Sequence, residues 1–268
     1  MQRLLTAAVL APPFVASMFW GPWQVFMAII VLGISLAAWE FGRIARPAGG
    51  RGVLALLPIL IPLAAAALAV GPQHPRVVFS LAVGLVLVPA CLVLFERSDL
   101  SKALAGVGAL TFGTLYFAVP MLVCFRLRQF DSWVVFLGFA IVFLGDTGAY
   151  YFGRAFGRRK LAPRVSPNKS WEGAFGGLAV ALLVTALWSL GRFEEIRWPL
   201  IGLAAVTSIA AQLGDLVESM FKRGSGIKDS GTLLPGHGGA YDRIDGLLFG
   251  LPVLWLGAQW LGIEALLP

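Results

Sequence analysis

Long apolar segments are the feature of this sequence that most limits its fold. About nine of them, each close to the length that crosses a bilayer, follow one another along the chain. Hydrophobic residues make up 58% of the 268 residues and charged residues 13%, against about 25% charged residues in a typical soluble domain. In lipid, only helices and closed barrels satisfy their backbone hydrogen bonds. Because the runs are continuous rather than alternating, the sequence predicts an all-α, polytopic membrane protein.

The apolar segments also set the expected organisation of the chain. The predicted spans cover residues 4–20, 23–43, 52–71, 76–95, 103–125, 132–153, 173–191, 198–221 and 246–266. We divide the chain into an N-terminal region, 1–130, with about five spans, and a C-terminal region, 131–268, which holds the polar motifs. Pro12 and Pro13 interrupt the first segment, which must therefore kink or re-enter the membrane.

Positive charge is distributed unevenly between the two sides of the membrane. With the N-terminus on one side, that side carries every lysine and arginine except Arg76, Arg126, Arg128, Arg192 and Arg197. The positive-inside rule then places the N-terminus and the polar connections 154–172 and 222–245 in the cytoplasm. We attribute the net charge of +7 to lysine and arginine gathered in loops on this one side of the membrane. Because no basic stripe with interleaved aromatic residues lies outside the spans, we expect no nucleic-acid partner.

Acidic residues in and beside the spans are the strongest candidates for function. Asp146 ends an apolar run, Asp215 and Glu218 are three residues apart, and so are Asp242 and Asp245. On a helix, a spacing of three places both side chains on one face. Carboxylates within a membrane are costly and usually functional. Two such pairs on neighbouring helices could hold a hard cation through oxygen ligands.

Some of these acids have another explanation, which is pairing with nearby bases such as Lys222 and Arg243. For Glu218 the structural and functional interpretations are both open. Glu40 lies near the end of the second span, three residues before Arg43, and we interpret these two residues as a helix-end ion pair.

The segment between the two acidic pairs, 219–239, is rich in glycine, hydroxyl and basic residues. Glycine lets backbone N–H groups approach an anion closely, and basic side chains compensate its charge. The segment is therefore typical of phosphate binding. His237 lies between glycines in a turn that would aim its ring.

This stretch resembles the signature of the phosphatidate cytidylyltransferases, also called CDP-diacylglycerol synthases. The matching positions are Ser219, Lys222, Arg223, Lys228, Asp229, His237, Gly238, Gly239, Asp242, Arg243 and Asp245. Two further segments are similar to motifs of the same family, namely Ser166 to Gly173 and Asp146 to Gly153. Together the matches cover residues 141–246. Ala240 departs from the pattern, which usually has a larger apolar residue there.

The resemblance implies transfer of CMP from CTP to phosphatidic acid, giving CDP-diacylglycerol and pyrophosphate at the surface of the lipid bilayer. It implies Mg²⁺ held by Asp215 and Asp242, with Asp245 and Asp146 in or near the same shell, and leaves a second cation open. The catalytic residues expected from it are Asp215, Lys222, Arg223, Lys228, Asp229, His237, Asp242, Arg243 and Asp245. Those expected to bind CTP are Ser166, Asn168, Lys169, Ser170 and Glu172, the last by orienting the loop. For His237, shaping the loop and contacting a phosphate are both open.

Other functions remain as alternatives. A CTP-dependent polyprenol or phytol kinase would transfer the γ-phosphoryl group instead. A transporter would be expected to carry polar interruptions in both halves of the chain, whereas here they gather in one. We also expect a bacterial inner-membrane location. Gly173, Gly176 and Gly177 are predicted to allow close helix packing, and association into a homodimer through such faces of small residues is a further hypothesis.

Overall fold

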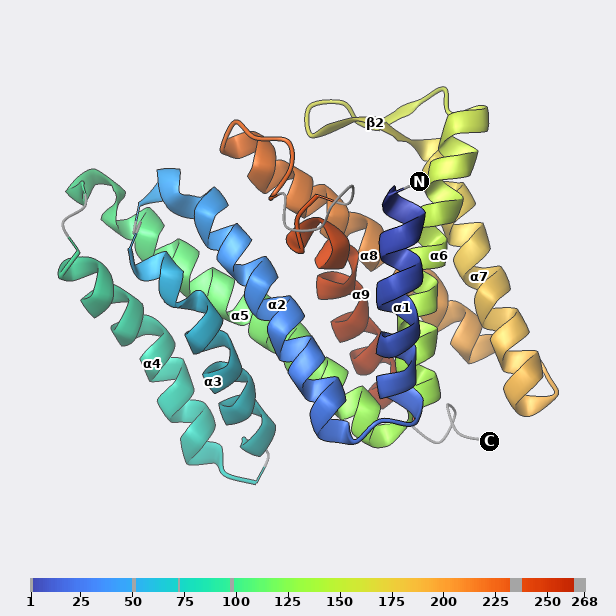
Figure 1. Cartoon of the computed structure of the whole chain (residues 1–268), viewed down its shortest axis with the longest axis horizontal. Coiled ribbons are helices and arrows are strands. Elements are labelled where there is room, and N and C mark those ends of the chain that lie inside the picture. Colours follow the sequence, from blue (N-terminus) through green and yellow to red (C-terminus); the bar gives the residue numbers. More distant parts are fainter. Residues whose placement is uncertain (1, 50–51, 72, 97–98, 232–237, 263–268) are drawn as a thin grey trace. The chain divides into compact units, whose positions relative to one another are not determined.

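The computed structural model describes the chain except for residues 1, 50–51, 72, 97–98, 232–237 and 263–268. Within the described residues the chain forms nine α-helices and one two-stranded sheet (Figure 1). The helices are α1 (Gln2–Phe19), α2 (Trp23–Ala45), α3 (Leu57–Val70), α4 (Pro75–Leu94), α5 (Ala103–Phe130), α6 (Ser132–Phe156), α7 (Trp171–Phe193), α8 (Trp198–Gly224) and α9 (Tyr241–Trp260). The strands are β1 (Lys160–Ala162) and β2 (Ser166–Ser170), and the short 3-10 helices are η1 (Arg46–Ala48), η2 (Val53–Leu56) and η3 (Leu100–Lys102).

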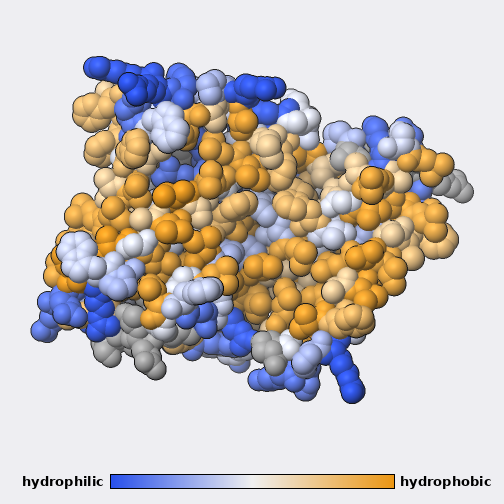
Figure 2. Space-filling model, turned by 180° about the vertical axis from the view of Figure 1, so that it is seen from behind, coloured by the Kyte–Doolittle hydropathy of each residue, from blue (hydrophilic) through white to orange (hydrophobic). Residues whose placement is uncertain are grey.

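The predicted all-α membrane architecture is confirmed. Within the described part of the chain, seven helical segments are long and apolar enough to cross a membrane. The predicted count of about nine spans is therefore not confirmed. Large apolar side chains such as Leu63, Phe79 and Leu183 are more than half exposed. Figure 2 shows hydrophobic residues over much of the visible surface. Such a surface suits lipid rather than water.

Two compact units make up the chain. The first consists of Met1–Phe125 and Phe221–Ile244, and the second of Arg126–Met220 and Asp245–Pro268. Helices α8 and α9 each contribute residues to both units. The first unit is thus discontinuous in sequence, because a segment from late in the chain belongs with the N-terminal helices. The predicted functional division at residue 130 stays a prediction.

In the first unit, the helices α1 to α5 pack mainly between sequence neighbours. Helix α2 contacts α1 and α3, and α3 contacts α4. The Thr111 hydroxyl of α5 donates to the Leu85 carbonyl of α4 at 2.9 Å. Gly113 brings α5 close to α2, since a Cβ there would lie 2.8 Å from the Phe41 ring.

An aromatic core joins the late segment to α2 and α5. Phe41 lies within 6.1 Å, between ring centroids, of Tyr116, Phe117, Phe221 and Tyr241. Tyr241 is fully buried, and its hydroxyl lies 3.2 Å from that of Tyr116. Edge-to-face ring pairs add to the stabilisation that burial gives.

In the second unit, small residues pack α6 against α7. A Cβ at Gly177 would lie 2.8 Å from the Gly145 carbonyl oxygen, and one at Gly173 would lie 2.8 Å from that of Ala149. The predicted role of these glycines in close helix packing is confirmed. Because they serve an interface within the chain, they do not provide a free face for a second copy.

Candidate functional site

Three carboxylates of the second unit come together where α8 approaches α9. Asp215 and Glu218 lie on α8 and Asp245 lies on α9. Each offers one oxygen, and the three oxygens lie within 4.8 Å of one another. The helices approach closely here because Gly214 has no side chain: a Cβ at this position would lie 2.7 Å from the Asp245 carbonyl oxygen.

The carboxylate cluster, meaning Asp215, Glu218 and Asp245, is largely removed from water. Glu218 is 1% exposed and Asp245 is 9% exposed. Lys169 forms an ion pair with Asp215. Asp215 and the more exposed Asp146 of α6 repel negative charge on Asp245, whereas Lys169 attracts it. Like charges this close in a poorly solvated place need a compensating cation to remain ionised together.

The chemistry of the cluster fits a hard divalent cation. Carboxylate oxygens are the protein ligands that Mg²⁺ takes, usually one or two of them together with water and substrate phosphates. The cluster contains Asp215 and Asp245 of the predicted metal ligands, and it adds Glu218. Asp242, the other principal ligand expected from the sequence, belongs to the first unit. Its role as a ligand, like that of Asp146, stays a prediction.

A β-hairpin carries the residues expected to bind CTP. Strand β1 pairs antiparallel with β2, with Lys160 opposite Ser170. The Ser170 hydroxyl accepts a hydrogen bond from the Gly173 N–H at 3.1 Å and so caps α7. The Glu172 carboxylate accepts from the Arg158 N–H at 3.0 Å and from the Arg159 N–H at 3.2 Å.

These contacts fix the hairpin to the N-terminal end of α7. Lys169 of β2 thereby reaches Asp215, while Asn168 is exposed and Ser166 is partly exposed. An exposed polar edge beside a paired lysine is suited to an anionic ligand. The predicted contacts of these residues with CTP stay predictions.

In the first unit, Asp242 accepts several hydrogen bonds from the polar connection 222–245, which we call the polar segment. Its carboxylate accepts from the Lys222 ammonium group at 2.7 Å, from the Gly239 N–H at 2.9 Å and from the Ser230 N–H at 3.2 Å. Gly238 has a φ of +79°, and a Cβ there would lie 2.7 Å from the Asp242 carboxylate. Gly238 is therefore required for the chain to pass so close to this acid.

Glu40 of α2 is an acid whose role the sequence did not reveal. It is fully buried. One carboxylate oxygen accepts from the Ser230 hydroxyl at 2.9 Å and from the Tyr241 N–H at 2.9 Å. The predicted helix-end ion pair with Arg43 is wrong, because the Arg43 guanidinium instead lies 5.0 Å from the centre of the Trp39 ring.

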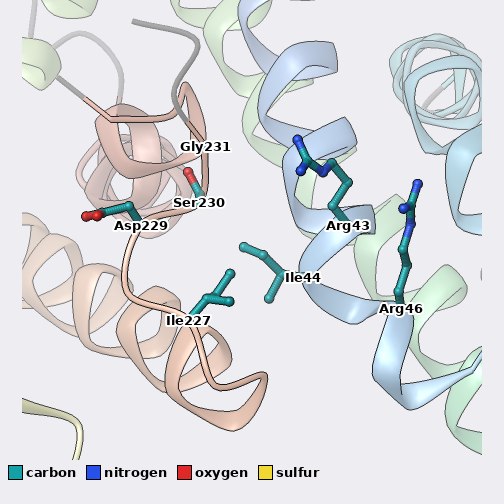
Figure 3. Close-up of a pocket in the computed structure, with 7 residues that line it drawn as sticks. All are labelled: Arg43, Ile44, Arg46, Ile227, Asp229, Ser230 and Gly231. Carbon is teal, nitrogen blue, oxygen red and sulfur yellow. The ribbon is translucent and has the colours of Figure 1, made fainter. Parts of the chain in front are cut away.

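A pocket of about 400 Å³ lies in the first unit beside Ser230, the residue whose hydroxyl binds Glu40 (Figure 3). Its lining residues are Arg43, Ile44, Arg46, Ile227, Asp229, Ser230 and Gly231. The Ser225 hydroxyl donates to the Ile44 carbonyl at 2.7 Å and joins the two sides of the pocket. Its two guanidinium groups favour an anionic group such as a phosphate, whereas the Asp229 carboxylate in the same lining opposes one.

The remaining predicted residues of the polar segment are on the surface. Arg223, Lys228, Asp229 and Arg243 are exposed. The Arg223 guanidinium donates to the Ile227 carbonyl at 3.2 Å. His237 lies outside the described residues.

Apolar spanning helices with a buried cluster of carboxylates define a polytopic membrane protein with a candidate cation site. The model of the cytidylyltransferase family matches residues 1–261. The chain is 39% identical to the phosphatidate cytidylyltransferase of Pseudomonas aeruginosa, over 97% of this chain and 98% of that one. It is also 42% identical to the phosphatidate cytidylyltransferases of Staphylococcus epidermidis and Staphylococcus aureus, over 60% of this chain and 59% of each of those. The chain belongs to the cytidylyltransferase family.

Proposed function

We propose that this protein transfers CMP from CTP to phosphatidic acid, giving CDP-diacylglycerol and pyrophosphate. The observation that carries the proposal is the similarity to a phosphatidate cytidylyltransferase over nearly the whole length of both chains. The carboxylate cluster, the paired Lys169 and the basic polar segment supply the charges that a reaction between two anions requires.

In this proposal a phosphate oxygen of phosphatidic acid attacks the α-phosphorus of CTP. A P–O bond forms to the lipid phosphate, and the bond to the β-phosphate oxygen breaks, releasing pyrophosphate. The attacking oxygen is already anionic at neutral pH, so no strong general base is needed. The protein acts mainly by positioning the two substrates and reducing their mutual repulsion.

Asp215 and Asp245, with Glu218 beside them, would hold Mg²⁺. When bound, this ion supplies positive charge to the reacting phosphates and to the leaving pyrophosphate. We keep Asp242 and Asp146 as further proposed ligands and leave a second cation open. Lys169, with Ser166, Asn168, Ser170 and Glu172, is proposed to bind CTP. Lys222, Arg223, Lys228 and Arg243 are proposed to contact phosphates, with Asp229 and His237 in the same segment.

We further propose that the protein lies in a bacterial inner membrane, with its N-terminus and both polar connections in the cytoplasm. The bacterial relatives and the distribution of lysine and arginine support this orientation. Lipid would then reach the site from the bilayer and CTP from the cytosol. A homodimer is part of the proposal, without an assigned interface.

Two labels on CTP test the reaction. Purified protein in detergent is given phosphatidic acid, Mg²⁺ and CTP labelled at either the α- or the γ-phosphate. Label at the α-phosphate should enter the lipid, and label at the γ-phosphate should leave as pyrophosphate. Transfer of the γ-label to a lipid, with none from the α-position, would instead identify a lipid kinase and refute the proposal.

A further inference from the structure

The fully buried Glu40 belongs to the N-terminal half of the chain, far in sequence from the polar segment. It nevertheless contacts that segment at two places, Ser230 and Tyr241. Its acceptor oxygen binds Ser230, 190 residues later, and Tyr241, 201 residues later. A buried carboxylate that accepts two hydrogen bonds is held in place far more firmly than a solvated one.

The residues that Glu40 binds are those that hold Asp242. Ser230 gives its hydroxyl to Glu40 and its N–H to the Asp242 carboxylate. Tyr241, whose N–H binds Glu40, directly precedes Asp242 in α9. The position of Asp242, and with it that of the paired Lys222, therefore depends on where α2 places Glu40.

Glycines make room for this contact. A Cβ on Gly231 would overlap one Glu40 oxygen, and a Cβ on Gly239 would overlap the other oxygen and the Ser230 hydroxyl. The Gly239 N–H binds Asp242, and the missing side chain at this position makes room for Glu40 and Ser230. The tight fit around one carboxylate indicates a site in which the place of the acid matters.

We propose that Glu40 is a positioning residue for CMP transfer: it fixes Ser230 and the start of α9 so that Asp242 and Lys222 keep the arrangement the reaction uses. The proposal rests on the proposed function. It assigns an N-terminal helix a direct part in ordering the polar segment. Glu40 itself touches no reacting group.

Three variants separate this role from a general contribution to stability. Glu40→Gln keeps an acceptor oxygen at the same reach, and Glu40→Leu removes it at similar volume. Thr114→Val is the matched control, because Thr114 is a buried residue of the same unit whose hydroxyl binds only within its own helix, to the Leu110 carbonyl.

We expect Glu40→Leu to lower kcat about 10- to 100-fold, the range seen when a group orienting a site residue is lost. Glu40→Gln should keep kcat within about fivefold, and Thr114→Val should stay near wild type. Amide hydrogen exchange adds a second readout: the Tyr241 amide should exchange faster in Glu40→Leu, while the helical amides of α2 and α5 should not. In a double variant with Ser230→Ala, the loss should be less than the product of the two single losses, because both act through one contact.

Unchanged kcat in Glu40→Leu would overturn the proposal. So would faster exchange spread over the whole first unit, which indicates lost stability. If Glu40→Leu does not fold, kcat lost to the same extent in Glu40→Gln and Thr114→Val would overturn it equally. Failure of wild type to transfer the α-label would refute the proposed function instead, and the exchange measurement on Tyr241 would still test the contact.

Discussion

Replacing Asp245 with asparagine should stabilise the metal-free protein and weaken its response to Mg²⁺. The carboxylate of Asp245 has an oxygen within 4.8 Å of oxygens of Asp215 and Glu218. Asparagine keeps the side-chain oxygen that accepts from the Gly246 N–H at 2.7 Å. The substitution thus removes one negative charge with little change of shape.

The size of the effect follows from the spacing of the charges. Two ionised carboxylates with oxygens 4.8 Å apart repel by about 3.5 kcal/mol at an effective dielectric constant of about 20. The repulsion cannot destabilise the folded protein by more than about 4 kcal/mol at pH 7, because one carboxylate would take up a proton instead. Protonating an aspartate costs about 1.4 kcal/mol for each pH unit above its ordinary pKa. Attraction from Lys169 reduces the repulsion further. We therefore expect Asp245→Asn to gain about 1–3 kcal/mol without divalent cation.

Mg²⁺ should reverse the order of stability of the wild type and Asp245→Asn. A cation that binds only the folded protein stabilises it by about 2.7 kcal/mol at a hundred times its Kd. The wild type should show this gain, and Asp245→Asn should show much less, with CMP transfer strongly reduced. The measurement is thermal unfolding in detergent with EDTA and over a series of Mg²⁺ concentrations.

Glu195→Gln is the control for this comparison, since it removes the same charge from an exposed side chain of the same unit. It should change stability by less than about 0.5 kcal/mol in either condition. If Asp245→Asn lowers stability in EDTA, the carboxylate cluster is not a cation site. The same conclusion follows if Mg²⁺ stabilises the wild type and Asp245→Asn equally.

Three other substitutions test separate parts of the structure. Lys169→Met should raise the apparent KM for CTP about tenfold, the loss expected for a charged contact of about 1.4 kcal/mol. Lys160→Met, on the neighbouring strand, should leave this KM unchanged. Equal KM values for the two variants would remove Lys169 from the nucleotide site. Gly177→Ala should lower the free energy of unfolding by about 1–3 kcal/mol because its Cβ meets the Gly145 carbonyl. Gly191→Ala in the same helix has open space around its Cβ and should be neutral or stabilising. Thermal unfolding of both variants tests whether α6 and α7 pack as described. Gly239→Ala should reduce CMP transfer at least tenfold by displacing Glu40 and Ser230. Gly224→Ala, whose Cβ has no neighbour within 4 Å, should retain activity. An active Gly239→Ala enzyme would contradict the described contacts between Gly239, Glu40 and Ser230.

The sequence was sufficient to predict the helices because hydrophobic length is a local property. Predicted spans such as 132–153 and 198–221 lie within α6 and α8 and differ from them by a few residues at their ends. The differences have a physical reason. Helix α8 continues to Gly224, so Lys222 and Arg223 occupy its last turn, where the helix dipole favours positive charge. The predicted span ended at residue 221, just before these two consecutive basic residues.

The hairpin at Lys160–Ser170 could not be predicted in the same way. Its strands are three and five residues long and carry mostly polar side chains, so no alternating apolar pattern marks them. What holds the hairpin is the contact of Glu172 with Arg158 and Arg159, which depends on the position of α7.

Within the candidate site, local spacing predicted that Asp215 and Glu218 share a helix face. It did not predict that Glu218 joins Asp245, because that requires the approach of α8 to α9. Glu40 was missed for a similar reason. Arg43, one turn away, offered a nearby partner, while the true partners lie about 200 residues later.

The span between Glu40 and Tyr241 also affects how the protein is made. Synthesis proceeds at about 5–20 residues per second, so the 201 residues that separate the two take on the order of 10–40 s to produce. Throughout that time α2 carries a carboxylate near the end of an apolar helix while the groups that satisfy it have yet to leave the ribosome. The nascent chain must shelter this charge with water, lipid headgroups or a proton until Ser230 and Tyr241 arrive. The first unit can therefore be completed only after its late segment, Phe221–Ile244, has been made.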